Sequence, residues 1–159
     1  MARRLRALRF PKILYDQMVQ HCLRDPKKEA CGILAGSAAK VVPQDELWRV
    51  MQVYEMQNVE NSPIGYSMDP KEQLAVERDM RTKHQKMLGI YHSYTARDAI
   101  PSPVDITLAI SPDVSYVLVS LKDLNHPRVE SYRIDGGRVD KEDVWIEESP
   151  AVSRQVGRG

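Results

Sequence analysis

Residues 91–105 read YHSYTARDAIPSPVD and contain the clearest structural signal in the chain. An apolar run ends in a His, a loop follows, and Ser102, Pro103 and Asp105 come in the order that opens a helix. Ser is a favoured N-cap, Pro suits the first helical position, and an acidic residue three positions after the cap completes a capping box. The segment therefore predicts a strand, a loop and a short helix that runs to about Ile110.

Two side chains at the end of this strand are expected to face the same way. Residues i and i+2 of a strand project from one face, so His92 and Tyr94 lie side by side. The helix start brings Asp105 back toward them. A hydrolytic zinc site uses three protein ligands from His, Asp or Glu and leaves the fourth position for water. The segment thus predicts a metal site in which Tyr94 stands where a second His would complete the ligand set.

Two further residues supply groups that a metal-bound water would need. The water requires a base, and the oxyanion that forms during hydrolysis requires a hydrogen-bond donor. Glu29, which precedes the apolar segment at residues 30–36, is the candidate base, and the Ser102 hydroxyl is the candidate donor. Taken alone, Glu29 is an ordinary solvated charge and Ser102 an ordinary cap. Only their joint spacing with the residues above indicates a site.

That joint spacing resembles the signature of the JAMM, or MPN-plus, metalloproteases. The signature is a Glu well upstream of His-Ser/Thr-His, followed by seven residues, a Ser, two residues and an Asp. In this chain it reads Glu29, His92-Ser93-Tyr94, seven residues, Ser102, two residues and Asp105. One position departs from the pattern, and it is Tyr94.

The resemblance extends over most of the chain, from about residue 11 to residue 120. EACGILAG at residues 29–36 and NSPIGYSMDP at residues 61–70 are similar to further segments of the family. The sequence of the loop at residues 92–102 is most similar to that of small bacterial members of the family, which process ubiquitin-like sulfur-carrier proteins. The resemblance therefore implies a zinc-dependent metallopeptidase or isopeptidase that cleaves the Gly-Gly-type C-terminal tail of such a carrier.

Carried over residue by residue, the resemblance implies zinc on His92 and Asp105, Glu29 as the catalytic base, and Ser102 as the residue that steadies the tetrahedral intermediate. The third ligand position falls on Tyr94, which leaves three outcomes open. Tyr94 ligates through its oxygen, solvent replaces the lost His in a weakened site, or zinc is lost. In the last case the protein would be a catalytically inactive MPN-type module that binds proteins.

The pattern of elements predicts an α/β, or α+β layered, domain, and the resemblance implies a mixed central sheet flanked by helices in the JAMM/MPN, cytidine-deaminase-like fold. Helices are expected at residues 11–24 and 69–87. Strands are expected at residues 30–36, 46–57, 88–94, 115–121, 128–134 and about 138–147. We predict one domain over residues 1–159, with a basic N-terminal arm at residues 1–10 and a disordered tail at residues 149–159.

The composition excludes several classes of partner. The chain has 159 residues, and its 23 Lys and Arg nearly balance 22 Asp and Glu, so net charge does not favour nucleic acid or a membrane surface. No apolar run reaches membrane-spanning length. Cys22 and Cys31 are too few for a disulfide framework and suit a reducing, cytoplasmic location, and Cys31 is expected to be a buried, inert thiol. Exposed strand edges would permit a homodimer.

Overall fold

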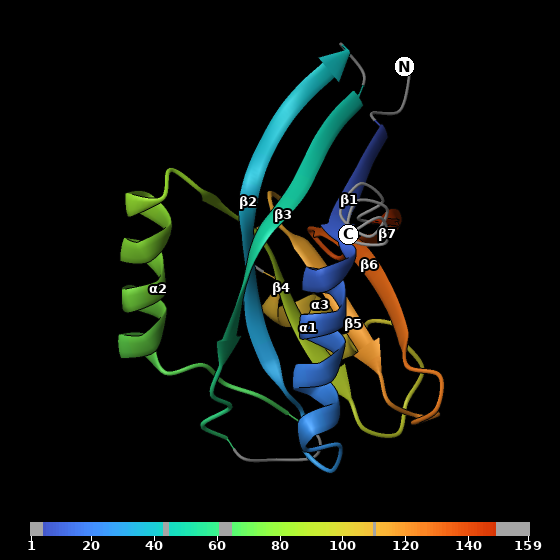
Figure 1. Ribbon diagram of the computed structural model, residues 1–159. Coiled ribbons are helices and arrows are strands. Elements are labelled where there is room, and N and C mark those ends of the chain that lie inside the picture. Colours follow the sequence, from blue (N-terminus) through green and yellow to red (C-terminus); the bar gives the residue numbers. More distant parts are fainter. Residues whose placement is uncertain (1–4, 43–44, 61–64, 110, 149–159) are drawn as a thin grey trace, which may run out of the picture.

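The computed structural model describes residues 5–42, 45–60, 65–109 and 111–148 (Figure 1). Within these residues a single sheet closes into a barrel in the strand order β1-β3-β2-β4-β5-β6-β7. Its strands are β1 (Leu5–Pro11), β2 (Cys31–Val42), β3 (Asp45–Met56), β4 (Lys86–Tyr94), β5 (Ser115–Ser120), β6 (Arg128–Asp135) and β7 (Arg138–Glu147). The helices are α1 (Lys12–Arg24), α2 (Pro70–Thr82) and α3 (Pro103–Leu108).

The sheet is mixed, as the sequence predicts, and it closes into a barrel, which the sequence does not predict. Strand β1 runs parallel to β3 and β7, and β4 runs parallel to β5, whereas the remaining neighbours are antiparallel. Because β1 pairs with β3 on one side and β7 on the other, every described strand has two neighbours. The pairing with β1 covers only residues 45–49 of β3, so within the described residues the rest of β3 is paired on the β2 side alone.

The prediction of a basic arm at residues 1–10 is wrong for its second half, because residues 5–11 form β1. Leu8 and Phe10 are fully buried, whereas Arg9 projects outward and stacks over the ring of Trp145, 4.3 Å from its centroid. Arg6, Leu8 and Phe10 share the buried face, where Glu142 pairs with Arg6, so the two-residue period of the strand outweighs the local charge. Residues 1–4 and the predicted tail at 149–159 lie outside the described residues.

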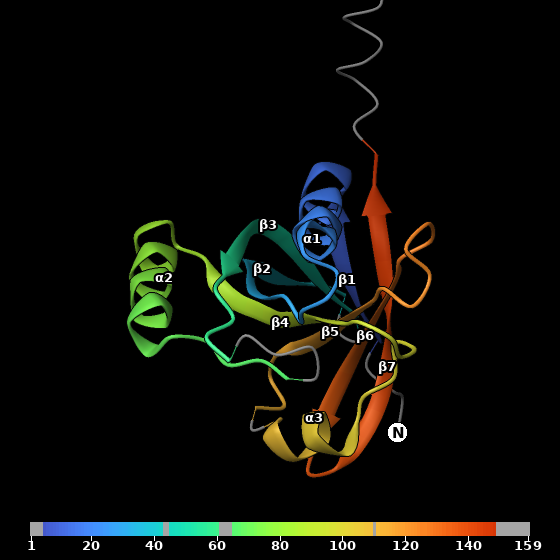
Figure 2. The same ribbon diagram turned by 90° about the horizontal axis from the view of Figure 1, so that it is seen from below.

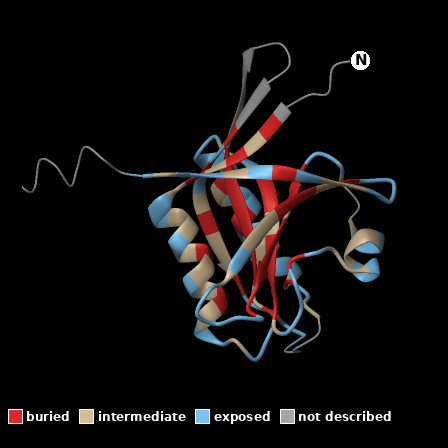
Figure 3. Ribbon diagram, turned by 90° about the vertical axis from the view of Figure 1, so that its right-hand side faces the viewer, coloured by how far each residue is buried: buried red, intermediate tan, exposed pale blue. Residues whose placement is uncertain are grey.

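The helices pack on separate parts of the barrel surface (Figure 2). Helix α1 buries Met18 and Cys22 in the largest apolar cluster, and α2 buries Val76 and Met80 in a second one. Helix α3 contributes the partly buried Ile106 to a third cluster. Figure 3 shows that the buried residues concentrate in the strands, while the outer surfaces of the helices are exposed. None of the described helices is long and apolar enough to cross a membrane.

Two of the predicted helices end earlier than expected. Helix α2 stops at Thr82, not near residue 87, because His84 takes a positive φ of 55° and β4 begins at Lys86. Helix α3 stops at Leu108, and the predicted end at residue 110 lies outside the described residues. Asp69 caps α2 through its side chain, as predicted.

Gly32 makes room for a large side chain behind the site strand. A Cβ atom at this position would lie 2.1 Å from the ring of Tyr91, which is fully buried. The Tyr91 hydroxyl lies 2.5 Å from Nδ1 of His21 on α1, so the phenol has a polar partner in the core. Residue 32 must therefore be Gly for β2 and β4 to pair with Tyr91 between them.

A buried ion pair joins the first and last strands of the barrel. Nε of Arg6 donates to Glu142 at 3.0 Å, and a second guanidinium nitrogen donates to Ser115 Oγ at 2.7 Å. The side chains of Arg6 and Glu142 are only 2% and 4% exposed. The Ser131 hydroxyl donates to the other Glu142 oxygen at 2.7 Å, so this carboxylate connects β1, β6 and β7.

We expect Glu142→Ala to lower the free energy of unfolding by about 3–5 kcal/mol, because Arg6 would stay buried without its carboxylate partner. Urea denaturation followed by circular dichroism measures this change. Asp16→Ala, which breaks the exposed pair between Lys12 and Asp16, is the matched control and should change stability far less. Equal effects of the two substitutions would contradict a structural role for the buried pair.

Candidate active site

Strand β4 places two of the predicted site residues on one face of the sheet. His92 and Tyr94 are 5% and 4% exposed, and their rings lie 5.2 Å apart in an edge-to-face arrangement. Ser93 faces the opposite way, where its hydroxyl accepts a hydrogen bond from the Ala30 amide at 2.8 Å. The Ser93 amide also donates to the Ala30 carbonyl at 3.0 Å. These two bonds tie the residue after Glu29 to the site strand.

Helix α3 begins with the predicted capping box and thereby fixes Asp105. The Asp105 amide donates to Ser102 Oγ at 3.1 Å, and the Ser102 amide donates to Asp105 Oδ2 at 2.9 Å. An α-helix leaves its first amide groups without intrahelical partners, and these reciprocal bonds satisfy two of them. The cap consequently holds the Asp105 carboxylate next to the end of β4.

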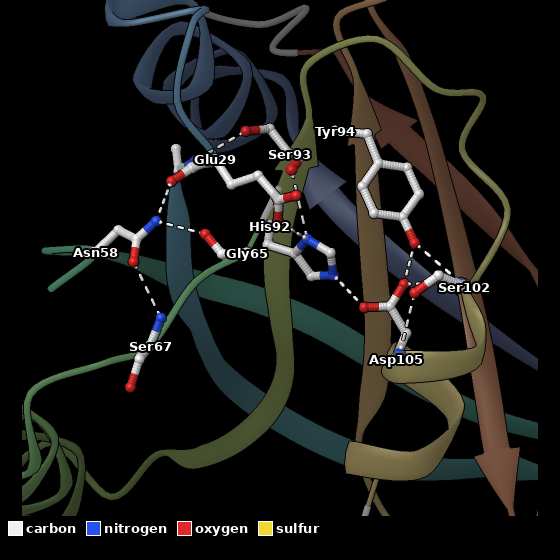
Figure 4. Close-up of polar contacts among 10 residues, drawn as sticks. Glu29, Asn58, Gly65, Ser67, His92, Ser93, Tyr94, Ser102 and Asp105 are labelled. Atoms are coloured by element: carbon white, nitrogen blue, oxygen red, sulfur yellow. Dashed lines mark hydrogen bonds and ion pairs between the residues drawn. The ribbon is translucent and has the colours of Figure 1, made fainter. Parts of the chain in front are cut away.

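The imidazole of His92 lies between two carboxylates (Figure 4). Its Nε2 is 3.0 Å from Asp105 Oδ1, and its Nδ1 is 3.3 Å from Glu29 Oε1. Glu29 is itself 7% exposed, so both partners lie in poorly solvated surroundings. The structure thus gathers Glu29, His92, Tyr94, Ser102 and Asp105 in one cluster, with Glu29 on the opposite ring nitrogen from Asp105.

Tyr94 completes this cluster through its hydroxyl group. The hydroxyl donates to Asp105 Oδ2 and accepts a hydrogen bond from the Ser102 amide at 3.0 Å. Both oxygens of the Asp105 carboxylate therefore have partners, one from His92 and one from Tyr94. The position that the signature reserves for a His is occupied by a phenol bonded within the protein.

The electrostatics of the cluster favour a charged His92 and a protonated Tyr94. Burial lowers the pKa of His92, but its hydrogen bonds to Asp105 and Glu29 outweigh this effect and raise the pKa to about 9. Burial acts to raise the pKa of Asp105, yet the bond to the His92 imidazolium holds it well below its usual range. Burial, followed by the bond to Asp105, raises the pKa of Tyr94. The cluster thus contains an imidazolium between two carboxylates and a neutral phenol.

The donor set fits zinc only in part. His92 Nε2 and Asp105 Oδ1 are 3.0 Å apart, close to the roughly 3.3 Å between neighbouring ligands of a tetrahedral zinc ion. Among the described residues, however, no group of three or more His, Cys, Asp or Glu side chains is arranged to hold a metal ion. The third donor is Tyr94, whose raised pKa opposes the proton loss that strong ligation requires. The cluster therefore offers two side chains of the types that zinc uses, and not the usual three-ligand set.

Two residues of the neighbouring loop belong to the site but were not predicted. Tyr66 stacks on the His92 ring with centroids 4.5 Å apart and planes at 29°. Asn58 donates from Nδ2 to the carbonyls of Glu29 and Gly65 at 2.8 and 2.9 Å. The sequence indicates a loop here. No spacing rule connects the side chains of this loop with the strand that carries His92, so the sequence alone does not predict these contacts.

Asn58 also organises the loop through its side-chain oxygen. Oδ1 accepts from the amides of Glu60 and Ser67, each at 3.0 Å. One amide side chain therefore makes bonds on both sides of the turn and connects it to the backbone of Glu29. This arrangement keeps Tyr66 over His92, because Asn58 bonds the residue before Tyr66 and the residue after it.

Both cysteines are buried free thiols, which agrees with the packing role predicted for Cys31. Cys22 and Cys31 are fully buried. Burial raises the pKa of each thiol to about 12, so neither forms a thiolate at neutral pH.

Comparison with known proteins gives consistent results. The family described as prokaryotic homologs of the JAB domain matches residues 11–135. The CysO-cysteine peptidase of Mycobacterium tuberculosis is 42% identical over 135 residues, which are 85% of this chain and 88% of the relative. The desampylase of Haloferax volcanii is 29% identical over 97 residues, 60% of this chain and 65% of that protein. A solution structure of a Desulfitobacterium hafniense protein has a TM-score of 0.78 and 35% identity, and covers 91% of this chain and 96% of that one.

Removal of the Asn58 side chain should loosen the loop over the site. We expect Asn58→Ala to lower the free energy of unfolding by about 1–3 kcal/mol, because the peptide groups that it bonds lose their partners. Urea denaturation tests this value, with Asn125→Ala in an exposed turn as the control. A change no larger than that of the control would mean that water replaces these bonds without cost.

The His92 cluster should make stability depend on pH. The pKa of His92 is raised in the folded state to about 9 from its ordinary 6.5, so its stabilising contribution is complete below pH 6.5 and is lost as pH rises through 9. In metal-free buffer we expect the free energy of unfolding to fall across this range. His92→Gln should remove that part of the decline, whereas His126→Gln on the surface should preserve it. A wild-type profile identical to that of His92→Gln would contradict the charged state.

Proposed function

Because the chain belongs to the family of prokaryotic homologs of the JAB domain, we propose that it is a peptidase that hydrolyses a bond at the C-terminal tail of a ubiquitin-like sulfur-carrier protein. The printed activities of its relatives, a CysO-cysteine peptidase and a desampylase, support this reaction class. The similarity to the first relative spans 85% of the chain at 42% identity, which makes it the stronger guide. The two free thiols suit a cytoplasmic setting for this reaction.

One observation carries the proposal: four residues from three separate segments meet within hydrogen-bonding distance. Glu29 precedes β2, His92 ends β4, and Ser102 and Asp105 open α3, yet His92 contacts both carboxylates at 3.0 and 3.3 Å. Such buried carboxylate pairs around one imidazole are costly to assemble and concentrate at functional sites. Packing alone does not require them.

The proposed roles follow from the hydrogen bonds that each group makes. Ser102 Oγ accepts from the Asp105 amide, so its own proton remains available to stabilise an oxyanion. Glu29 is the second carboxylate on the His92 ring and is the proposed base. In this structure it also orients the ring by bonding Nδ1, a role that carboxylates commonly play toward metal-binding histidines.

Zinc is the proposed cofactor, with His92 and Asp105 as the residues that would hold it. When bound, zinc would polarise the scissile carbonyl and lower the pKa of a water molecule. Tyr94 would join as a ligand only after losing its phenolic proton, and its bond to Asp105 opposes this loss. We therefore propose that zinc binds more weakly here than at a site with three standard ligands.

A second candidate function is favoured by that same bond from Tyr94 to Asp105. If the phenol keeps the carboxylate occupied at cellular zinc concentrations, the site recognises the carrier's tail without cleaving it. The protein would then be a binding module of the same fold. The two candidates share a partner and differ in whether hydrolysis follows.

Tyr94→His should separate the two candidates. We expect the substitution to raise zinc affinity at least about tenfold, because it supplies the missing third ligand and frees Asp105. Elemental analysis after purification without chelator measures zinc per chain. Mass spectrometry of a carrier tail incubated with each protein detects cleavage. Tyr54→His, on β3 and bonded to Asp79, is the control for an added imidazole.

The outcomes distinguish the possibilities. Cleavage by the wild-type chain supports the peptidase, whereas tail binding by the wild type with cleavage only by Tyr94→His supports the binding module. In whichever protein cleaves, Glu29→Gln should reduce the rate by about 10²- to 10⁴-fold if Glu29 is the base. Failure of both proteins to bind or cleave any carrier tail would refute the proposed partner.

A further inference from the structure

An arginine of the loop between β4 and α3 returns over the site. The guanidinium carbon of Arg97 lies 4.6 Å from the centroid of the Tyr94 ring, in cation–π geometry. The hydroxyl of that ring contacts Asp105 and Ser102. Arg97 is therefore within one side chain's width of the groups proposed to carry out hydrolysis, although no sequence signature includes it.

The fold fixes the backbone that carries Arg97. The Ser120 hydroxyl donates to the Arg97 carbonyl at 2.5 Å, and the Tyr132 hydroxyl donates to the Ala99 carbonyl at 2.6 Å. Ala99 is 4% exposed, so the loop is packed against the barrel. The backbone that carries the guanidinium is consequently positioned by β5 and β6.

The nearby carboxylates are already occupied by other groups. Asp98 pairs with Lys122 at 3.4 Å, and both oxygens of Asp105 are bonded to His92, Tyr94 and the Ser102 amide. In the described part of the chain, Arg97 makes no ion pair with an acidic side chain, and its side chain is exposed. Within the described residues, a guanidinium that has no acidic partner thus lies beside the site, and its planar set of donors suits a carboxylate ligand.

We propose that Arg97 binds the free α-carboxylate of a single amino acid attached to the carrier's tail. The inference rests on the proposed function and specifies its substrate: a chain that ends one residue after the bond at the site. Arg97 would then be a specificity-determining residue, selecting a terminal amino acid over an isopeptide-linked protein, which presents no carboxylate at this place.

The length of one residue agrees with the position of Arg97. The carboxylate carbon of a terminal amino acid lies about 2.5 Å from its own nitrogen, which belongs to the scissile bond. A guanidinium–carboxylate hydrogen bond adds about 2.8 Å. Arg97 lies over the ring whose hydroxyl contacts Asp105 and Ser102, so a carboxylate one residue beyond a bond held at these groups suits its position. Each further residue would displace the carboxylate by about 3.5 Å.

Binding of labelled peptides tests the proposal without relying on turnover. The probes are a fluorescein-labelled octapeptide that ends in Gly-Gly-Ala with a free carboxylate and the same peptide with a C-terminal amide. All proteins carry Glu29→Gln to prevent hydrolysis, and fluorescence anisotropy gives each Kd. We expect the Arg97-containing protein to bind the acid about tenfold more tightly than the amide.

Arg97→Gln should abolish that preference, so that the acid and the amide bind equally, while Arg78→Gln on the exposed face of α2 should retain it. Equal binding of acid and amide by the Arg97-containing protein would overturn the inference but leave the proposed function intact. A preference that survives in Arg97→Gln would also overturn it. Binding of neither peptide would overturn both the role of Arg97 and tail recognition itself.

Discussion

The alternation of side chains along β4 determines what lies on each side of the sheet. Tyr91 and Ser93 face the cluster that α1 covers, whereas His92 and Tyr94 face α3. The strand is paired with β2 and β5, and a shift of its register by one residue would exchange the two faces. The register of β4 consequently sets both the core contacts of Tyr91 and the position of His92, and a change of register would lose both.

The charges of the cluster explain why a phenol is tolerated at the third ligand position. Two poorly solvated carboxylates require positive charge nearby, and a divalent ion would normally provide it. Here the imidazolium of His92 supplies one charge, and the hydroxyl of Tyr94 donates a hydrogen bond to the same carboxylate. The protein thereby compensates internally for much of what a metal would neutralise. A metal ion that bound here would have to compete with this internal arrangement and would change the protonation of the cluster.

The sequence predicts most of the local structure because the signals are local. The cap of α3 at Ser102 and the start of α2 near residue 69 each depend on neighbouring residues, and both are present. Strand β1 was missed because four arginines in the first nine residues obscured the alternation of Leu8 and Phe10. Closure of the barrel depends on pairing between opposite ends of the chain, which no local pattern specifies.

The same distinction holds for the candidate site. A spacing signature predicted five residues that the fold brings together, whereas Asn58, Tyr66 and Arg97 reach this cluster through contacts that depend on how the loops fold. Asn58 donates to the backbone carbonyl of Glu29. Because every residue has such a carbonyl, the sequence does not indicate which residue accepts this bond.

Helix α3 has six residues, none of them buried, which is too short and too exposed for a helix to persist alone. It is held by its cap and by the bonds of Asp105 to His92 and Tyr94. Opening of this helix and disassembly of the site are therefore the same local unfolding event. A ligand that binds Asp105 will therefore stabilise the folded form of α3. The binding free energy of such a ligand includes the free energy of folding this helix.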